Sequence, residues 1–278
     1  GDGMTLHVPL SIKVRAFSLP EKKSFSHTIH TRSISWTTDL DSYYKVLSDY
    51  YLSTSDVKND VKVSFDKNGK IHLNTTDWDK EMDIAVRKYG QEWIFLPTIH
   101  MYGIPKAANL SAKWMGITMI QPGGKFTPEF EQKFGQFLVA IHKHIKEKGW
   151  LDRVYIYCFD EPPEKDSAFV MNGFAKLAKY APKLRRFLTS PCRRELLGGP
   201  QTWCPIAPDL DTPLARERQR LGEEFWLYVC TMPCAPYATE FIDHPAVELR
   251  TWLWQSWAEN VTGVLIWTAN LWTSRSVY

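Results

Sequence analysis

The sequence predicts an α/β fold, a TIM-like (β/α)8 barrel with a short N-terminal leader strand. Short apolar segments of strand length alternate with longer segments of helical periodicity, which is typical of a parallel sheet covered by helices. About seven or eight such units can be counted, and the 278 residues match the length of about 250 that a closed barrel needs. We assign residues 1–20 to the leader and residues 21–278 to a single barrel domain.

The first third of the chain supplies the leader and the first units. Residues 8–17 alternate apolar and polar side chains, as a half-buried strand does, and residues 24–29 predict a second strand. Thr38 and Asp39 can cap a helix that continues to about residue 51. A second helix is expected over residues 76–89, ending at Gly90, and a buried strand over residues 93–96.

The clearest helix covers residues 127–148. Thr127 is a suitable N-cap, Pro128 fits the first turn and Gly149 can end the helix. The later units follow the same alternation. Strands are predicted at 154–159, 186–189, 201–205, 225–230 and 263–268, and helices at 163–181, 214–223 and 245–259. Trp254 and Trp257 fall at helical spacing, and we interpret them as packing between helix and barrel.

Composition excludes several classes of protein. Hydrophobic residues make up 44% of the chain, which excludes an intrinsically disordered protein. The formal net charge of +3 gives no indication of nucleic-acid binding. No run of 18 apolar residues could span a membrane, and the N-terminus lacks the apolar region of a signal peptide. Five cysteines without a C-x-x-C pair predict no zinc or disulfide framework. No dinucleotide or phosphate loop is present, so we expect no cofactor. His142 and His144 are two positions apart on a predicted helix and do not face one another, so we expect no metal.

Two carboxylates follow the apolar strand at 154–159. Asp160 and Glu161 are succeeded by Pro162 and Pro163, and active sites of such barrels lie where the strands end. One interpretation is that the acidic residues only cap the next helix. The other is that they form a catalytic pair at the mouth of the barrel.

Aromatic residues make up 14% of the chain and include 12 tryptophans. Trp267, Asn270 and Trp272 straddle the end of the last strand. An aromatic wall with an amide offers the flat apolar face and the fixed hydrogen-bond partners that a sugar site needs.

Four ordered blocks of the sequence resemble glycoside hydrolase family 123, the β-N-acetylgalactosaminidase family. The blocks are Tyr157-x-x-Asp160-Glu161-Pro162; Trp226-x-Tyr228-x-Cys230 with Pro233, Pro236 and Tyr237; Phe241-Ile242-Asp243-x-Pro245 with Arg250 and Trp254; and Gly263-x-Leu265-x-Trp267-x-x-Asn270-x-Trp272. The agreement extends from about Val14 to Trp272. Family members usually carry a β-sandwich domain before the barrel, and we interpret residues 1–20 as a remnant of it.

The resemblance implies a retaining exo-glycosidase that cleaves terminal β-linked N-acetylgalactosamine. The 2-acetamido group of the substrate would supply the nucleophile and form an oxazolinium-like intermediate. In this scheme a charged Asp160 orients the acetamido N–H, and a neutral Glu161, buried beside aromatic rings, protonates the leaving oxygen and later activates water. Tyr228 is expected to bind the acetamido carbonyl or to orient a carboxylate, unless it is only a core tyrosine.

Further residues are assigned to the sugar. We predict that Trp267 forms the platform under the ring, that Trp272 and Tyr237 line the rim, and that Asn270 binds hydroxyls. His100 follows the strand at 93–96 and should lie at the same face, where a lone histidine is often structural.

Alternatives remain open at this stage. A β-N-acetylglucosaminidase or a broad β-hexosaminidase differs from the leading hypothesis at one hydroxyl of the substrate. A carbohydrate-binding barrel without catalysis is the alternative from another class. The expected partner is in every case a glycan or glycoconjugate with terminal β-N-acetylhexosamine. Such substrates favour an extracellular or periplasmic location if a signal has been removed.

Overall fold

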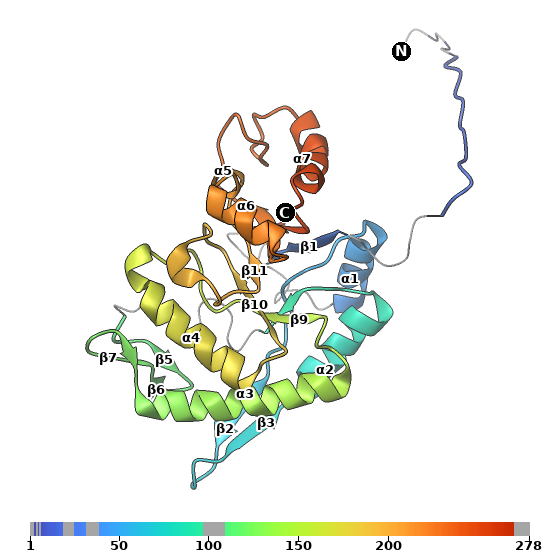
Figure 1. Ribbon diagram of the computed structural model, residues 1–278. Helices are drawn as coiled ribbons and strands as arrows, with labels where there is room; N and C mark the ends of the chain where they lie inside the picture. The colour runs from blue at the N-terminus through green and yellow to red at the C-terminus, as the bar shows by residue number, and fades with distance from the viewer. Residues whose placement is uncertain are drawn as a thin grey trace.

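A computed structural model describes residues 3, 5, 7–18, 25–31, 39–96 and 109–269 of the chain. Parallel strands form a central sheet, and the long helices lie outside it (Figure 1). In their order across the sheet the strands are β1 (Ser26–Ile29), β13 (Gly263–Ile266), β12 (Glu224–Val229), β11 (Thr202–Trp203), β10 (Arg185–Leu188), β9 (Val154–Ile156) and β4 (Ile94–Phe95).

The segment 53–55 occupies the position between the two edges of this sheet. The Ile29 amide donates to the Ser53 carbonyl at 2.9 Å, and the Ser55 amide donates to the Ile29 carbonyl at 3.1 Å. On the other side, the Phe95 amide donates to the Ser55 carbonyl at 2.9 Å. The segment therefore acts as an eighth strand and closes the ring, which confirms the predicted (β/α)8 barrel.

The helices follow the predicted alternation closely. They are α1 (Leu40–Asp49), α2 (Thr76–Met82) with its π-helical continuation η2 (Asp83–Lys88), α3 (Pro128–Lys148), the 3-10 turn η4 (Glu164–Asp166), α4 (Ser167–Tyr180), the 3-10 turn η5 (Arg194–Leu196), α5 (Ala207–Leu210), α6 (Pro213–Arg220) and α7 (Val247–Ala258). The Thr127 hydroxyl accepts from the Phe130 amide at 3.2 Å, and Gly149 ends α3 with a φ of 74°. Asp39 caps α1 through the Ser42 amide.

Aromatic side chains fill the interior of the barrel. Its buried residues are Trp93, Phe95, Tyr155, Tyr157, Phe187, Cys204, Trp226 and Leu265. A separate and larger core lies between the strands and the surrounding helices. Gly263 is needed within the barrel, because a Cβ at this position would lie 2.4 Å from the Trp226 ring. The interior is therefore solid below the strand ends, and the space for a ligand lies above it.

Two predictions of local structure are wrong. Residues 7–18 contain no strand and are exposed, although the division of the chain at residue 20 stays a prediction. Trp254 and Trp257 are 75% and 72% exposed and do not pack on the barrel. Apolar residues occur on all sides of α7, so the periodicity of the sequence does not indicate which side is buried. In the structure the buried side carries Trp252.

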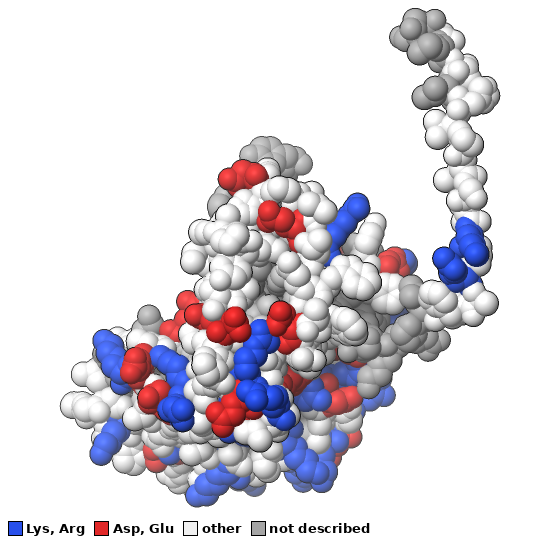
Figure 2. Space-filling view, turned by 45° about the horizontal axis from the view of Figure 1, so that its top comes forward, with Lys and Arg blue, Asp and Glu red and all other residues white. Residues whose placement is uncertain are grey.

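Three antiparallel hairpins were not predicted. They pair β2 (Lys62–Phe65) with β3 (Ile71–Asn74), β5 (Lys113–Trp114) with β6 (Ile117–Thr118), and β7 (Ile120–Gln121) with β8 (Lys125–Phe126). Basic and acidic side chains are interspersed over the face shown in Figure 2. Within the part of the chain that the structure describes, no helix is both long and apolar enough to cross a membrane.

Candidate active site

A cavity of about 290 Å³ opens at the carboxyl ends of the barrel strands. It is lined by His30, Tyr157, Asp160, Glu161, Thr189, Tyr228, Cys230, Thr231, Leu265 and Trp267. Most of these residues lie at the end of a strand or just after it, such as Thr189 after β10 and Trp267 after β13. The cavity is thus at the end of the barrel where this fold places active sites.

Two hydroxyl groups support the Asp160 carboxylate. The Tyr157 hydroxyl donates to Asp160 Oδ1 at 2.6 Å, and the Thr189 hydroxyl donates to the same oxygen at 3.0 Å. A β-bridge between Asp160 and Thr189 continues the pairing of β9 with β10 up to the cavity. Burial, and then the charge of Asp160, raise the pKa of Tyr157 well above that of an ordinary tyrosine. The phenol therefore remains a hydrogen-bond donor to Asp160.

Glu161 has a left-handed backbone with a φ of 42°. This conformation is strained for a residue with a side chain, and more so before a proline, and costs about 1–3 kcal/mol. The Glu161 amide donates to the Thr189 carbonyl at 3.1 Å, which holds the turn in place. The turn explains how two consecutive residues both line one cavity, since consecutive strand residues would point to opposite sides.

Tyr228 on β12 donates a hydrogen bond to Glu161 Oε1. Burial, and then the interaction with Glu161, raise the pKa of Tyr228, so that its hydroxyl stays protonated. Tyr228 was expected either to bind the acetamido carbonyl or to orient a carboxylate, and its hydrogen bond to Glu161 corresponds to the second of these roles. The expected burial of Glu161 is wrong, because both Glu161 and Asp160 are exposed side chains at the mouth of the barrel.

A histidine lies on the β1 side of the cavity. His30 is buried, and its Nδ1 lies 3.4 Å from Asp56 Oδ1 and 3.2 Å from the Ser55 hydroxyl. Asp56 is itself fixed by the Thr31 amide, which donates to its other oxygen at 2.5 Å. This arrangement fixes the imidazole at the edge of the cavity.

A second pocket of about 340 Å³ adjoins the first. The two share Glu161, Tyr228, Cys230 and Thr231, but Asp160 lines only the first. The remaining wall of the second pocket is largely apolar, with Pro162, Pro191, Pro205, Ile206 and Met232 beside Ser190 and Asp209. Glu161 therefore lies at the boundary between two compartments.

The structure brings together four of the predicted site residues, namely Asp160, Glu161, Tyr228 and Trp267. Tyr237 lines a different pocket, on the outside of the barrel. His100, Asn270 and Trp272 lie outside the described residues, so their roles stay predictions. Among the described residues, no group of three or more His, Cys, Asp or Glu side chains is placed to hold a metal ion.

A sequence model of the glycoside hydrolase 123 catalytic domain matches residues 28–277, nearly the whole chain. The chain belongs to glycoside hydrolase family 123. A solved family 123 glycoside hydrolase from Clostridium perfringens, described for the hydrolysis of glycolipid glycans, superimposes with a TM-score of 0.60 at 15% identity. The match covers 87% of this chain and 49% of that one, so this chain spans about half the length of that relative.

The barrel is shared more widely. A family 10 xylanase from Thermobacillus composti gives a TM-score of 0.52 at 12% identity, over 90% of this chain and 86% of the xylanase. At such identities the likeness shows the fold alone. No curated protein matches the sequence.

Two residues that contact Asp160 in the candidate site received no role from sequence reasoning. Tyr157 stands in a block quoted for the resemblance but received no role, and Thr189 ends a correctly predicted strand. The rule that barrel sites form at strand ends pointed to Thr189, but a threonine at a strand end is too common to be selected without the structure.

Proposed function

We propose that this family 123 chain is a retaining exo-glycosidase that hydrolyses terminal β-linked N-acetylgalactosamine by substrate-assisted catalysis. The observation that carries the proposal is the unequal support of two neighbouring carboxylates in one cavity. Asp160 accepts hydrogen bonds from Tyr157 and Thr189, whereas Glu161 accepts one from Tyr228. Such unequal surroundings suit two carboxylates with different tasks.

Asp160 is assigned to the acetamido group. As the acetamido oxygen attacks C1 of the sugar, the C1–O bond to the leaving group breaks and positive charge develops on the acetamido nitrogen. A carboxylate that accepts the N–H stabilises this charge and holds the group in the geometry for attack. The two hydroxyl donors hold the Asp160 carboxylate in place for this task.

Glu161 is assigned to proton transfer. It donates its proton to the leaving oxygen in the first step. In the second step its carboxylate takes a proton from the water that adds to C1 and opens the oxazolinium ring, so the proton count balances and the anomeric configuration is retained. Its place at the boundary of the two pockets supports this assignment, because the leaving oxygen lies between the sugar and the rest of the substrate. We assign the sugar to the cavity with Asp160 and Trp267, and the leaving group to the pocket with Met232 and Ile206.

Hydrolysis of paired chromogenic β-N-acetylgalactosaminide and β-N-acetylglucosaminide substrates tests the proposal. We expect release from the galacto substrate. Asp160→Asn should lose turnover on every substrate, and Glu161→Gln chiefly on substrates with poor leaving groups. Glu164→Gln is the matched control, because Glu164 is an exposed carboxylate three positions from Glu161 that lines neither pocket.

Three results would contradict the assignment. Preference for the gluco substrate would make the enzyme a β-N-acetylglucosaminidase. Unchanged rates in both carboxylate variants would remove the pair from the mechanism. No release, together with equal affinity for the product sugar and for a thiazoline analogue of the intermediate, would favour a carbohydrate-binding barrel.

A further inference from the structure

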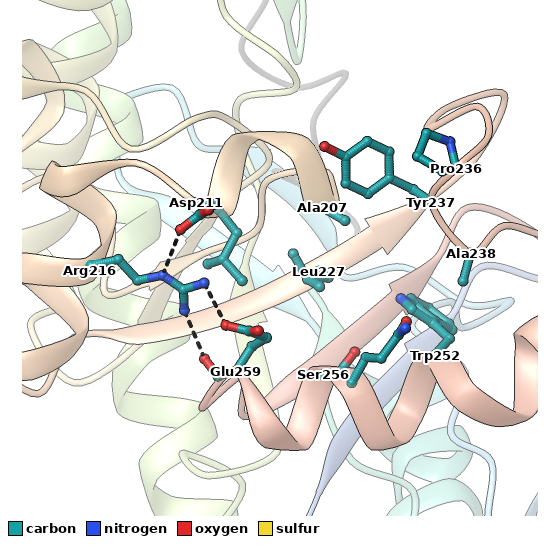
Figure 3. A pocket seen from close by; sticks show the side chains of 12 residues that line it. Ala207, Asp211, Arg216, Leu227, Pro236, Tyr237, Ala238, Trp252, Ser256 and Glu259 are labelled. Atoms are coloured by element: carbon teal, nitrogen blue, oxygen red, sulfur yellow. Dashed lines mark hydrogen bonds and ion pairs between the residues drawn. The ribbon is translucent and has the colours of Figure 1, made fainter.

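A separate pocket of about 330 Å³ lies outside the barrel, between helices α5, α6 and α7 and the outer face of β12 (Figure 3). It shares no lining residue with the carboxylate cavity or with the pocket beside it. Leu227 of β12 lies at its base, and the aromatic side chains of Trp252 and Tyr237 line it from α7 and from the segment after β12. Its volume is at the lower end of the range for small-molecule sites, which suits one sugar ring rather than an oligosaccharide.

Ser256 lines this pocket, and its hydroxyl has no hydrogen-bond partner although the residue is only 1% exposed. Buried hydroxyl groups are rarely left without a partner, so each such group calls for an explanation. The preceding residue, Gln255, is exposed and lines the same pocket, where its amide can both donate and accept. A ligand with hydroxyl groups would satisfy both side chains.

Charges close one end of the pocket. Arg216 Nε lies 3.3 Å from Asp211 Oδ1, and Arg216 Nη2 lies 2.5 Å from Glu259 Oε2, as the dashed lines of Figure 3 show. The guanidinium is thus matched by two carboxylates, and the three groups together carry a charge of −1. Such an end repels anions, and its carboxylate oxygens are acceptors suited to the hydroxyl groups of a neutral molecule.

We propose that this pocket is a second, non-catalytic binding site for a neutral sugar ring. An apolar floor with aromatic walls complements the C–H face of a sugar, and Gln255, Ser256 and the carboxylates complement its hydroxyl edge. A purely apolar ligand would leave these polar groups unsatisfied, and an acidic sugar would meet the carboxylates. The site does not depend on which bond the barrel cleaves.

The pocket is connected to the carboxylate cavity through the chain. Thr231, directly after the end of β12, lines the cavity, and Tyr237, six residues later and 42% exposed, lines the pocket. A single short segment therefore contacts both sites.

Tryptophan indole signals in a ¹⁵N-labelled protein test the proposal, because Trp252 reports on this pocket and Trp267 on the carboxylate cavity. The two signals are assigned from Trp252→Phe and Trp267→Phe. The probes are N-acetylgalactosamine, methyl β-galactoside and glucuronate. We expect the two neutral sugars to shift the Trp252 signal with a dissociation constant in the range of about 1–10 mM. Glucuronate should need at least about fivefold higher concentration.

Two variants and a control assign the shift to the pocket. Gln255→Ala and Ser256→Ala should each weaken the Trp252 response about five- to tenfold, because each removes one hydrogen-bonding group. Both should fold, since Gln255 is exposed and Ser256 loses only an unpartnered hydroxyl. Gln132→Ala on α3, an exposed helical glutamine, should leave the response unchanged.

A Trp252 signal that does not move, that moves as strongly in both variants as in the wild type, or that moves as readily with glucuronate as with the neutral sugars would overturn the proposal. If the Trp252 signal shifts and the Trp267 signal does not, the result would count against the proposed function and would still support this second site.

Discussion

Replacing Tyr157 by phenylalanine removes one of the two hydroxyl donors to Asp160 and leaves the ring in place. The Tyr157 hydroxyl lies 2.6 Å from Asp160 Oδ1 and 2.6 Å from the Thr189 hydroxyl. The ring is packed among the aromatic side chains of the barrel interior, which do not depend on the hydroxyl. The variant therefore tests whether Asp160 must be held by Tyr157 for catalysis.

The magnitude follows from the hydrogen bond that is lost. A hydrogen bond to a charged group contributes about 1.5–3 kcal/mol. Thr189 still donates to the same oxygen, so the lower part of this range applies. About 1.5–2 kcal/mol corresponds to a loss of about 10- to 30-fold in kcat/KM.

The assay is hydrolysis of a chromogenic β-N-acetylgalactosaminide by the wild type, Tyr157→Phe and Tyr155→Phe. Tyr155 lies two residues earlier, on β9, and is also buried, and its hydroxyl takes no part in the hydrogen bonds that join Tyr157, Thr189 and Asp160. Tyr155→Phe should change the rate by less than about twofold. Equal losses in the two variants would refute the reasoning, because the effect would then come from packing rather than from Asp160.

Three further perturbations test other parts of the structure. Tyr228→Phe should lower kcat/KM about tenfold on substrates with poor leaving groups and less on activated ones, because it frees Glu161; an equal loss on both would argue against this contact. Gly263→Ala should destabilise the fold by about 1–3 kcal/mol, since its methyl group would overlap the Trp226 ring, and an unchanged urea midpoint would contradict this. Partial burial raises the pKa of Asp79, but hydrogen bonds from Lys148 and His144 outweigh it and hold that pKa below normal. Because the pKa of Asp79 is lower in the folded state than in the unfolded state, where it is about 3.9, its ionisation stabilises the fold at pH values above about 3.9. This stabilisation is lost as the pH falls through the pKa of the folded state. Asp79→Asn should therefore lower the melting temperature at pH 7, and the difference in melting temperature from the wild type should become smaller below about pH 4. A difference that stays constant with pH would exclude the ionic contribution of Asp79.

The sequence was sufficient for the parts of the fold that depend on local pattern. The cap at Thr127 and the left-handed Gly149 delimit α3 as predicted, because both act through neighbouring residues. The exposed side of α7 and the short segment 53–55 could not be recognised from the sequence. The helix lacks apolar periodicity, and the segment is held by hydrogen bonds to residues distant in the chain, such as Ile29 and Phe95.

The site was predictable to a similar extent. Asp160 and Glu161 stand together in the chain, and their place after a strand predicted a shared location. Two of the three hydroxyl donors come from elsewhere in the chain, since Thr189 follows another strand and Tyr228 lies on a third. Exposure could not be inferred either, because it depends on how the left-handed turn at Glu161 directs both carboxylates toward the mouth of the barrel.

The role of the substrate's own acetamido group is tested most directly with a series of aryl β-N-acetylgalactosaminides in which the acetyl group carries zero to three fluorine atoms. Fluorine withdraws electrons from the carbonyl oxygen and weakens it as a nucleophile. If that oxygen attacks C1 while Asp160 holds the N–H, kcat/KM should fall steeply with each fluorine. Rates independent of fluorination would show that the protein supplies the nucleophile, and would contradict the roles proposed for Asp160 and Glu161.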